Sequence, residues 1–122
     1  MNTNKWTTYK FSNAKVVKNR VIVPPMASQT ANDKGFVTDS TISHYQSLAQ
    51  SQAGTIIVEY SYVHPSGKGE LNQLGVASDE YIEGLSKLSN VIHQSGALAG
   101  LQIVHAGGKS DPKITGGPLY ST

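Results

Sequence analysis

The amino-acid sequence predicts an α/β fold built on a parallel sheet. Three short apolar runs, at residues 21–23, 55–58 and 98–104, are rich in β-branched residues and nearly continuous rather than alternating. That pattern is typical of strands covered on both faces, as in a parallel sheet. Two segments with helical periodicity separate the runs, and parallel strands need crossovers of that kind. The predicted order is therefore strand, helix, strand, helix, strand.

The residues before the first strand predict a short hairpin. In the lead-in, residues 1–19, Phe11 stands before the turn-like pair Ser12 and Asn13, and Val16 and Val17 follow it. Apolar residues on both sides of such a turn favour two short antiparallel strands. The hairpin is expected to lead into the first strand of the sheet, which ends at Pro24 and Pro25.

The first crossover helix is expected to begin after Thr38. Thr38 is a good N-cap, Asp39 suits the first turn, and Gly54 is expected to end the segment in a left-handed conformation. Four apolar residues recur at helical spacing and predict the buried face: Ile42, Tyr45, Leu48 and Ala49.

The second crossover helix shows the same pattern. Ser78 is the expected cap, Asp79 and Glu80 follow at the positive end of the helix dipole, and Gly96 is the expected stop. The predicted buried face consists of Ile82, Leu85, Leu88 and Ile92.

The spacing of these elements indicates part of a larger barrel. The second and third strands begin about 34 and 43 residues after their predecessors, against an average of ~31 for a unit of a (β/α)8 barrel. The expected units are residues 20–53, residues 54–96, and a third strand with a terminal loop at residues 97–122. Three strands cannot close a barrel, so the sequence predicts an N-terminal portion of a single barrel domain with an open edge.

Composition excludes several classes of function. The formal charge of +2 is spread without clusters, which argues against a nucleic-acid interface. The absence of cysteine excludes disulfides, thiolate nucleophiles and cysteine-based zinc sites, and the four histidines lack metal-ligand spacing. Gly67, Gly69 and Gly75 do not fit a dinucleotide-binding loop and predict a flexible loop instead. No apolar run reaches ~20 residues, and a cytoplasmic protein is the default expectation.

The ends of the strands are the candidate functional positions, because chemistry in α/β barrels lies at the carboxyl ends of the strands. These ends are residues 25–27, residues 59–61, and residues 102–107, where Gln102 is a polar residue in an apolar strand. A purely structural interpretation is open at each place. Residues 25–27 also fit a rigid turn that contains a packing methionine. Residues 59–61 also fit an ordinary polar end of a strand, and Gln102 also fits a core amide with its own hydrogen-bond partners.

Three spaced segments together resemble a known family. The segments KNRVIVPPMAS, GTIIVEYSYVHPSGKG and LGVASDEYIEGLSKLSNVIHQSGALAGLQIVHAGGKS are similar, in order and spacing, to the N-terminal part of the old yellow enzyme family, from about Phe11 to Lys109. This resemblance implies a TIM barrel that holds FMN at its mouth. It also implies NAD(P)H as the reductant and hydride transfer to an α,β-unsaturated or other small-molecule acceptor.

The resemblance also implies roles for five residues. Pro25, Met26 and Ala27 correspond to residues whose backbone follows the flavin ring, and Ala27 replaces the Thr or Cys whose side chain tunes the flavin in relatives. Tyr60 stands where relatives have a small residue near the flavin. Gln102 matches a glutamine whose amide bonds the pyrimidine edge of the flavin, for which a group that both donates and accepts is suited.

The family places its substrate-binding pair, its proton-donating tyrosine and its FMN phosphate site on later strands. No catalytic residue is therefore expected within this chain, which looks truncated and is expected to be inactive alone. The alternatives are a nonenzymatic module or half of a split barrel that pairs with another chain. The partner expected for either is a second copy of the chain, in a homo-oligomer, or another chain paired through the open edge. Neither nucleic acid nor a membrane is an expected partner.

Overall fold

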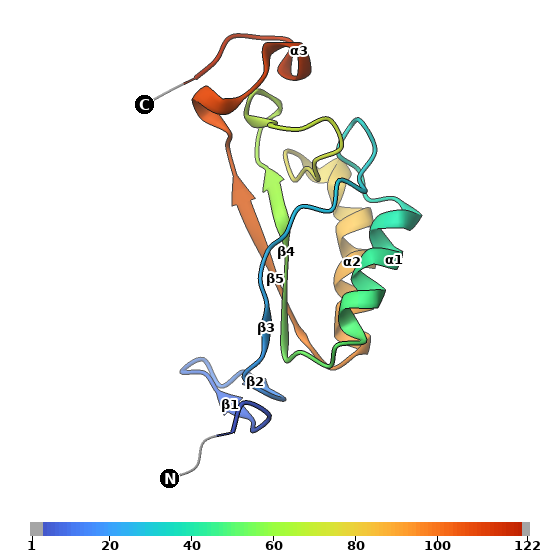
Figure 1. Cartoon of the computed structure of the whole chain (residues 1–122), viewed down its shortest axis with the longest axis vertical. Helices are drawn as coiled ribbons and strands as arrows, with labels where there is room; N and C mark the ends of the chain where they lie inside the picture. Colours follow the sequence, from blue (N-terminus) through green and yellow to red (C-terminus); the bar gives the residue numbers. More distant parts are fainter. Residues whose placement is uncertain (1–3, 121–122) are drawn as a thin grey trace.

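The computed structural model describes residues 4–120, so residues 1–3 of the lead-in and residues 121–122 of the terminal loop lie outside the described residues. A parallel sheet in the order β3-β4-β5 is flanked on one side by both main helices (Figure 1). The strands are β3 (Ile22–Val23), β4 (Thr55–Tyr62) and β5 (Leu98–Val104), and the helices are α1 (Asp39–Ala49) and α2 (Ile82–Gln94). The predicted order and the parallel pairing are confirmed.

The pairing of β4 with β5 contains a bulge. Val58 pairs with Leu101 and pairing resumes only at Ser61 with Ile103. Two residues of β4 therefore oppose the single Gln102 of β5, which defines a β-bulge. The end of the second strand was predicted at residues 59–61, and the strand continues through this bulge to Tyr62.

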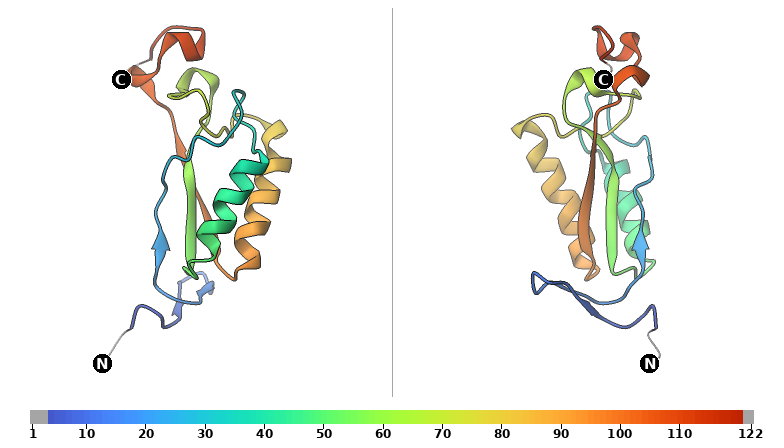
Figure 2. Two further views of the ribbon diagram at one scale, coloured as in Figure 1. Left: turned by 45° about the vertical axis from the view of Figure 1, so that its right-hand side comes forward. Right: turned by 90° about the vertical axis from the view of Figure 1, so that its left-hand side faces the viewer.

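The predicted lead-in hairpin is present. Strand β1 (Tyr9–Lys10) pairs antiparallel with β2 (Val16–Val17). The hairpin lies below the sheet, at the end where the parallel strands begin (Figure 2). Phe11 shares a concave surface with Thr55, Ile57 and Gly100, so the hairpin approaches the face of the sheet that the helices do not cover.

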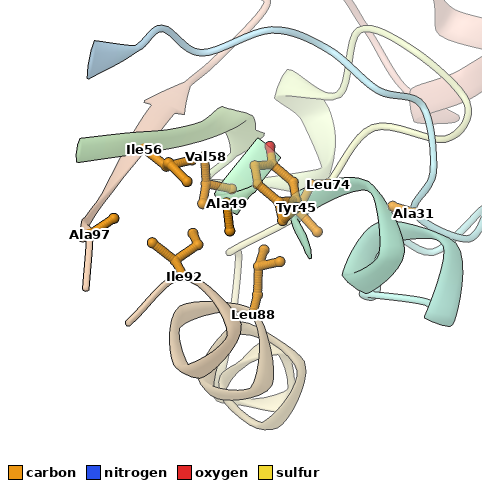
Figure 3. Close-up of a cluster of buried hydrophobic side chains, with 9 residues drawn as sticks. All are labelled: Ala31, Tyr45, Ala49, Ile56, Val58, Leu74, Leu88, Ile92 and Ala97. Carbon is orange, nitrogen blue, oxygen red and sulfur yellow. The ribbon is translucent and has the colours of Figure 1, made fainter. Parts of the chain in front are cut away.

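A hydrophobic core fills the space between the sheet and the two helices (Figure 3). Fully burying one aliphatic side chain of this size contributes about 1.5–3 kcal/mol, so this layer holds the helices on the sheet. The buried members are Ala31, Tyr45, Ala49, Ile56, Val58, Leu74, Leu88, Ile92 and Ala97.

The ends of α1 confirm one prediction and contradict another. Thr38 caps the helix as predicted. The Thr41 amide donates to the Thr38 hydroxyl at 3.2 Å, and the Thr38 amide donates to the Thr41 hydroxyl at 3.1 Å. The left-handed residue after α1 is Gln52, with φ of 65°, so the role predicted for Gly54 was wrong. Gly54 is needed for close approach instead, because a Cβ atom there would collide with the backbone oxygen of Asn19.

The start of α2 also differs from the prediction. A 3-10 turn, Asp79–Tyr81, precedes the helix, and the Ser78 side chain makes no capping hydrogen bond. Gly96 has a φ of 81° and ends the segment as predicted. Ile82 is 57% exposed rather than buried, because it lines an open concave surface with Val58 and Leu101 at the uncovered edge of the sheet.

The segment after β5 is more structured than the predicted loop. It contains a 3-10 turn, Gly107–Lys109, and the short helix α3 (Pro112–Thr115). Asp111 caps α3 by accepting a hydrogen bond of 2.9 Å from the Lys113 amide. Within residues 4–120, no helix has both the length and the hydropathy needed to cross a membrane.

Candidate functional site

The predicted site residues gather at one edge of the sheet. Because β3, β4 and β5 are parallel, the segment after β3, the end of β4 and the end of β5 meet where the strands finish (Figure 1). Pro25 is half-buried, and Met26 and Ala27 are exposed. Tyr60 is half-buried within β4, and Gln102 lies in β5. The structure thus brings the three predicted strand ends together.

Gln102 is exposed, so its prediction as a residue of a buried strand was wrong. Strand β5 is the edge of the sheet, and Ile103 beside it is 65% exposed. A Cβ atom at Gly100 would contact the Ile57 side chain at 3.4 Å, so these two residues share a face. Side chains alternate along a strand, which places Gln102 on that same face, away from the helices.

Glu59 is a member of the site that the sequence analysis named only as a polar strand terminus. Its side chain is 2% exposed. The Ser28 amide donates to one carboxylate oxygen at 2.6 Å, and the Ser28 hydroxyl donates to the other at 2.6 Å. A charged residue inside an apolar run was the available signal, because a buried carboxylate requires hydrogen-bond donors.

Tyr45 connects α1 to the bulge. Its hydroxyl accepts a hydrogen bond of 2.8 Å from the Glu59 amide and lies 3.4 Å from a Glu59 carboxylate oxygen, to which it donates. Burial raises the pKa of Tyr45, the bond from the Glu59 amide opposes that rise, and the charge of the Glu59 carboxylate adds to it. The hydroxyl therefore keeps its proton and remains a donor at neutral pH.

Tyr60 also keeps its proton. Burial raises the pKa of Tyr60 to about 12, and the nearby Glu70 carboxylate contributes to the rise. The phenol is therefore neutral at physiological pH. It can donate a hydrogen bond to a ligand or pack beside one, as Tyr side chains combine an apolar ring with a polar tip.

Two loops above the strand ends are joined through a serine. The Ser66 hydroxyl lies 2.7 Å from Nδ1 of His64 and 3.1 Å from Nε2 of His105. Ser66 belongs to the 3-10 turn Pro65–Gly67 after β4, and His105 follows β5. The four histidines are widely spaced in the sequence, and the fold brings two of them to one residue.

The chemistry of the exposed groups fits a flat heterocycle such as a flavin. The Gln102 amide offers both a donor and an acceptor. Met26 and Ala27 are exposed at the neighbouring strand end, and their backbone groups can donate and accept as well. These groups suit the alternating N–H and C=O groups of a flavin's polar edge.

Helices on one side of a parallel sheet, with polar groups at the carboxyl ends of the strands, are the arrangement of part of an α/β barrel. Residues 8–116 match the NADH:flavin oxidoreductase / NADH oxidase family, and the chain belongs to this family. It is 41% identical to an NADPH dehydrogenase of Bacillus subtilis over 96 residues, which are 78% of this chain and 28% of that protein. It is 39% identical to an NADH oxidase of Thermoanaerobacter brockii over 103 residues, 84% of this chain and 16% of that protein.

A solved structure agrees with the family assignment. The old yellow enzyme from Trypanosoma cruzi is 30% identical and superposes with a TM-score of 0.78 over 90% of this chain and 29% of its own. The resemblance seen in the sequence is confirmed, and the fold is that of the N-terminal portion of this barrel. The family implies FMN as the cofactor, with NADH or NADPH as the reductant. The chain spans less than a third of each of these relatives.

Proposed function

We propose that this chain forms the first part of the FMN-binding mouth of an NAD(P)H-dependent oxidoreductase. The observation that carries the proposal is the position of Gln102, which is exposed on the face away from the helices and opposite a bulge in the neighbouring strand. Bulges often re-aim side chains beside active sites. Family membership supports the same cofactor.

Each of the five predicted residues has a distinct part in this proposal. The Gln102 amide donates to and accepts from the polar edge of the flavin. Pro25, Met26 and Ala27 present their backbone to the ring, and the Ala27 methyl group supplies no hydrogen bond. Tyr60 presents a neutral phenol. When bound, FMN supplies the electron transfer from NAD(P)H to an acceptor, and the protein supplies binding and orientation.

The acceptor in this proposal is an activated alkene or another small electron acceptor, and the residues that act on it lie outside residues 1–122. Residues 4–120 form three strands of a barrel that needs eight. The chain by itself is therefore expected to bind FMN weakly and to show no turnover.

A grafted barrel tests the proposal. In this protein, residues 8–116 of the chain replace the matching N-terminal segment of the Bacillus subtilis NADPH dehydrogenase. The grafted barrel should be yellow and bind FMN, and Gln102→Leu should weaken that binding about 5–150-fold, since one or two hydrogen bonds of about 1–1.5 kcal/mol are lost. Fluorescence titration with FMN measures the affinity.

The control is Gln46→Leu, which changes an exposed amide on α1, far from the strand ends. It should leave FMN binding unchanged. An unaltered affinity in the Gln102→Leu grafted barrel contradicts the role of Gln102, and a colourless grafted barrel contradicts the function as a whole.

A second candidate function is supported by the open edge of β5. Leu101 and Ile103 there are 40% and 65% exposed. Exposed apolar residues along an unpaired edge strand favour pairing with another chain. The chain would then act as one part of a split barrel, as a nonenzymatic module, or as a homo-oligomer.

A further inference from the structure

The feature that the proposed function does not use is the buried carboxylate of Glu59. It is 2% exposed, and among residues 4–120 no lysine, arginine or histidine nitrogen lies within ion-pair distance of it. Burying a charge without a counter-charge is costly unless hydrogen bonds satisfy it. The two bonds of 2.6 Å from Ser28 have the short lengths expected of charge-assisted hydrogen bonds.

The carboxylate joins two of the three elements that carry the proposed flavin contacts, and its own residue lies opposite the third. Its partner Ser28 directly follows Ala27 in the segment after β3. Glu59 itself directly precedes Tyr60 in β4 and belongs to the bulge opposite Gln102. One side chain therefore fixes how the segment after β3 lies against the bulge.

The bulge is held from the helix side as well. A bulged residue loses its regular ladder hydrogen bonds, and the Glu59 amide donates instead to the Tyr45 hydroxyl at 2.8 Å. Tyr45 is 1% exposed within the core, so its position is set by packing. Both the backbone and the side chain of Glu59 are consequently fixed.

We propose that Glu59 is a positioning residue for FMN. Its carboxylate, oriented by Tyr45 and bonded to Ser28, holds the backbone of residues 25–28 and the bulge in one geometry toward the flavin. The FMN part of this inference rests on the proposed function, whereas the bond between Glu59 and Ser28 does not.

The first experiment tests the bond in the 122-residue chain without FMN. A short hydrogen bond to a carboxylate moves the amide proton of Ser28 downfield and slows its exchange with solvent. Glu59→Gln should move the Ser28 proton resonance upfield and accelerate its exchange at least tenfold. The matched control is Glu83→Gln, which alters a carboxylate that is 82% exposed and paired with Lys87. This control should change neither the position of the Ser28 amide proton resonance nor its rate of exchange with solvent.

If Glu59→Gln fails to fold, Ser28→Ala decides the same question. It removes the hydroxyl bond and keeps the amide bond, so the amide proton of residue 28 should stay downfield. An upfield position in Ser28→Ala, or an unchanged Ser28 resonance in folded Glu59→Gln, overturns the assignment.

The second experiment uses the grafted barrel. Glu59→Gln should weaken FMN binding about tenfold and shift the reduction potential of the bound flavin, because the backbone of residues 25–28 is then held differently toward the flavin. Glu59→Asp, one methylene shorter, should not restore the affinity, and Glu83→Gln should match the parent.

If Glu59→Gln changes neither the affinity for FMN nor the reduction potential of the bound flavin, the positioning role is overturned. A purely structural role would lower stability and leave the reduction potential of the bound flavin unchanged. Failure of the parent grafted barrel to bind FMN rejects the proposed function itself. The Ser28 resonance in the chain then still decides whether Glu59 holds residues 25–28.

Discussion

Removing one hydroxyl group, in Tyr45→Phe, tests how the bulge is stabilised. In the native chain this hydroxyl accepts a hydrogen bond from the Glu59 amide at 2.8 Å and donates to the Glu59 carboxylate at 3.4 Å. Phenylalanine keeps the ring, which is 1% exposed and packed in the core. The substitution therefore removes hydrogen bonds without opening a large cavity.

The expected cost follows from what remains buried. The Glu59 amide loses its partner, and an unsatisfied buried donor costs about 1–3 kcal/mol. The lost bond to the carboxylate is long and adds little. We expect a loss of about 1.5–3 kcal/mol in the free energy of unfolding, which corresponds to a fall in Tm of roughly 5–15 °C for a chain of this size.

Urea unfolding followed by far-UV circular dichroism measures this loss. The slope of the free energy of unfolding against urea concentration should stay unchanged, so that the change in midpoint alone reports the change in stability. The matched control is Tyr9→Phe, because Tyr9 is 44% exposed on the hairpin. The control should stay within about 0.5 kcal/mol of the parent. A loss below that limit in Tyr45→Phe would refute the account of the bulge.

Two further predictions concern pH and association. Tyr60 has its pKa raised from 10.0 to about 12 in the folded chain, so the stability it contributes is complete below pH 10 and is lost as the pH rises toward 12. Tyr60→Phe should flatten the alkaline decline of the urea midpoint over that range, and an unaltered decline contradicts the raised pKa. Ile103→Lys should reduce self-association through the β5 edge, measured by sedimentation velocity, because a charge blocks edge pairing. Lys87→Ala on α2 is the control. Equal self-association of the parent chain, Ile103→Lys and Lys87→Ala excludes pairing at this edge.

Periodicity and end signals predicted most of the fold. Strand β5 was predicted at its observed bounds, because an apolar β-branched run between turn residues has few alternatives. Thr38 and Gly96 were predicted at the helix ends that they occupy. Each of these signals is local, and the local preference agrees with the tertiary fold.

The errors arise where the deciding contact is distant in sequence. Glu59 and Ser28 are separated by 31 positions, and no local pattern links them or reveals the bulge. Gly54 was expected to be left-handed, yet its contact with Asn19, 35 positions away, decides its conformation. Gln102 is exposed because β5 is an edge strand of the sheet. The flavin contacts of Pro25, Met26, Ala27, Tyr60 and Gln102 stay predictions.

The hydrophobic core between the sheet and the helices has a consequence for synthesis. Its buried members run only from Ala31 to Ala97. A chain made from its N-terminus at about 5–20 residues per second therefore has every member of this core within seconds of Ala31 appearing. The helices can dock on the growing sheet at that stage and cover one of its two faces. The face that carries Gln102 stays exposed, and it is where a chaperone would meet the nascent protein.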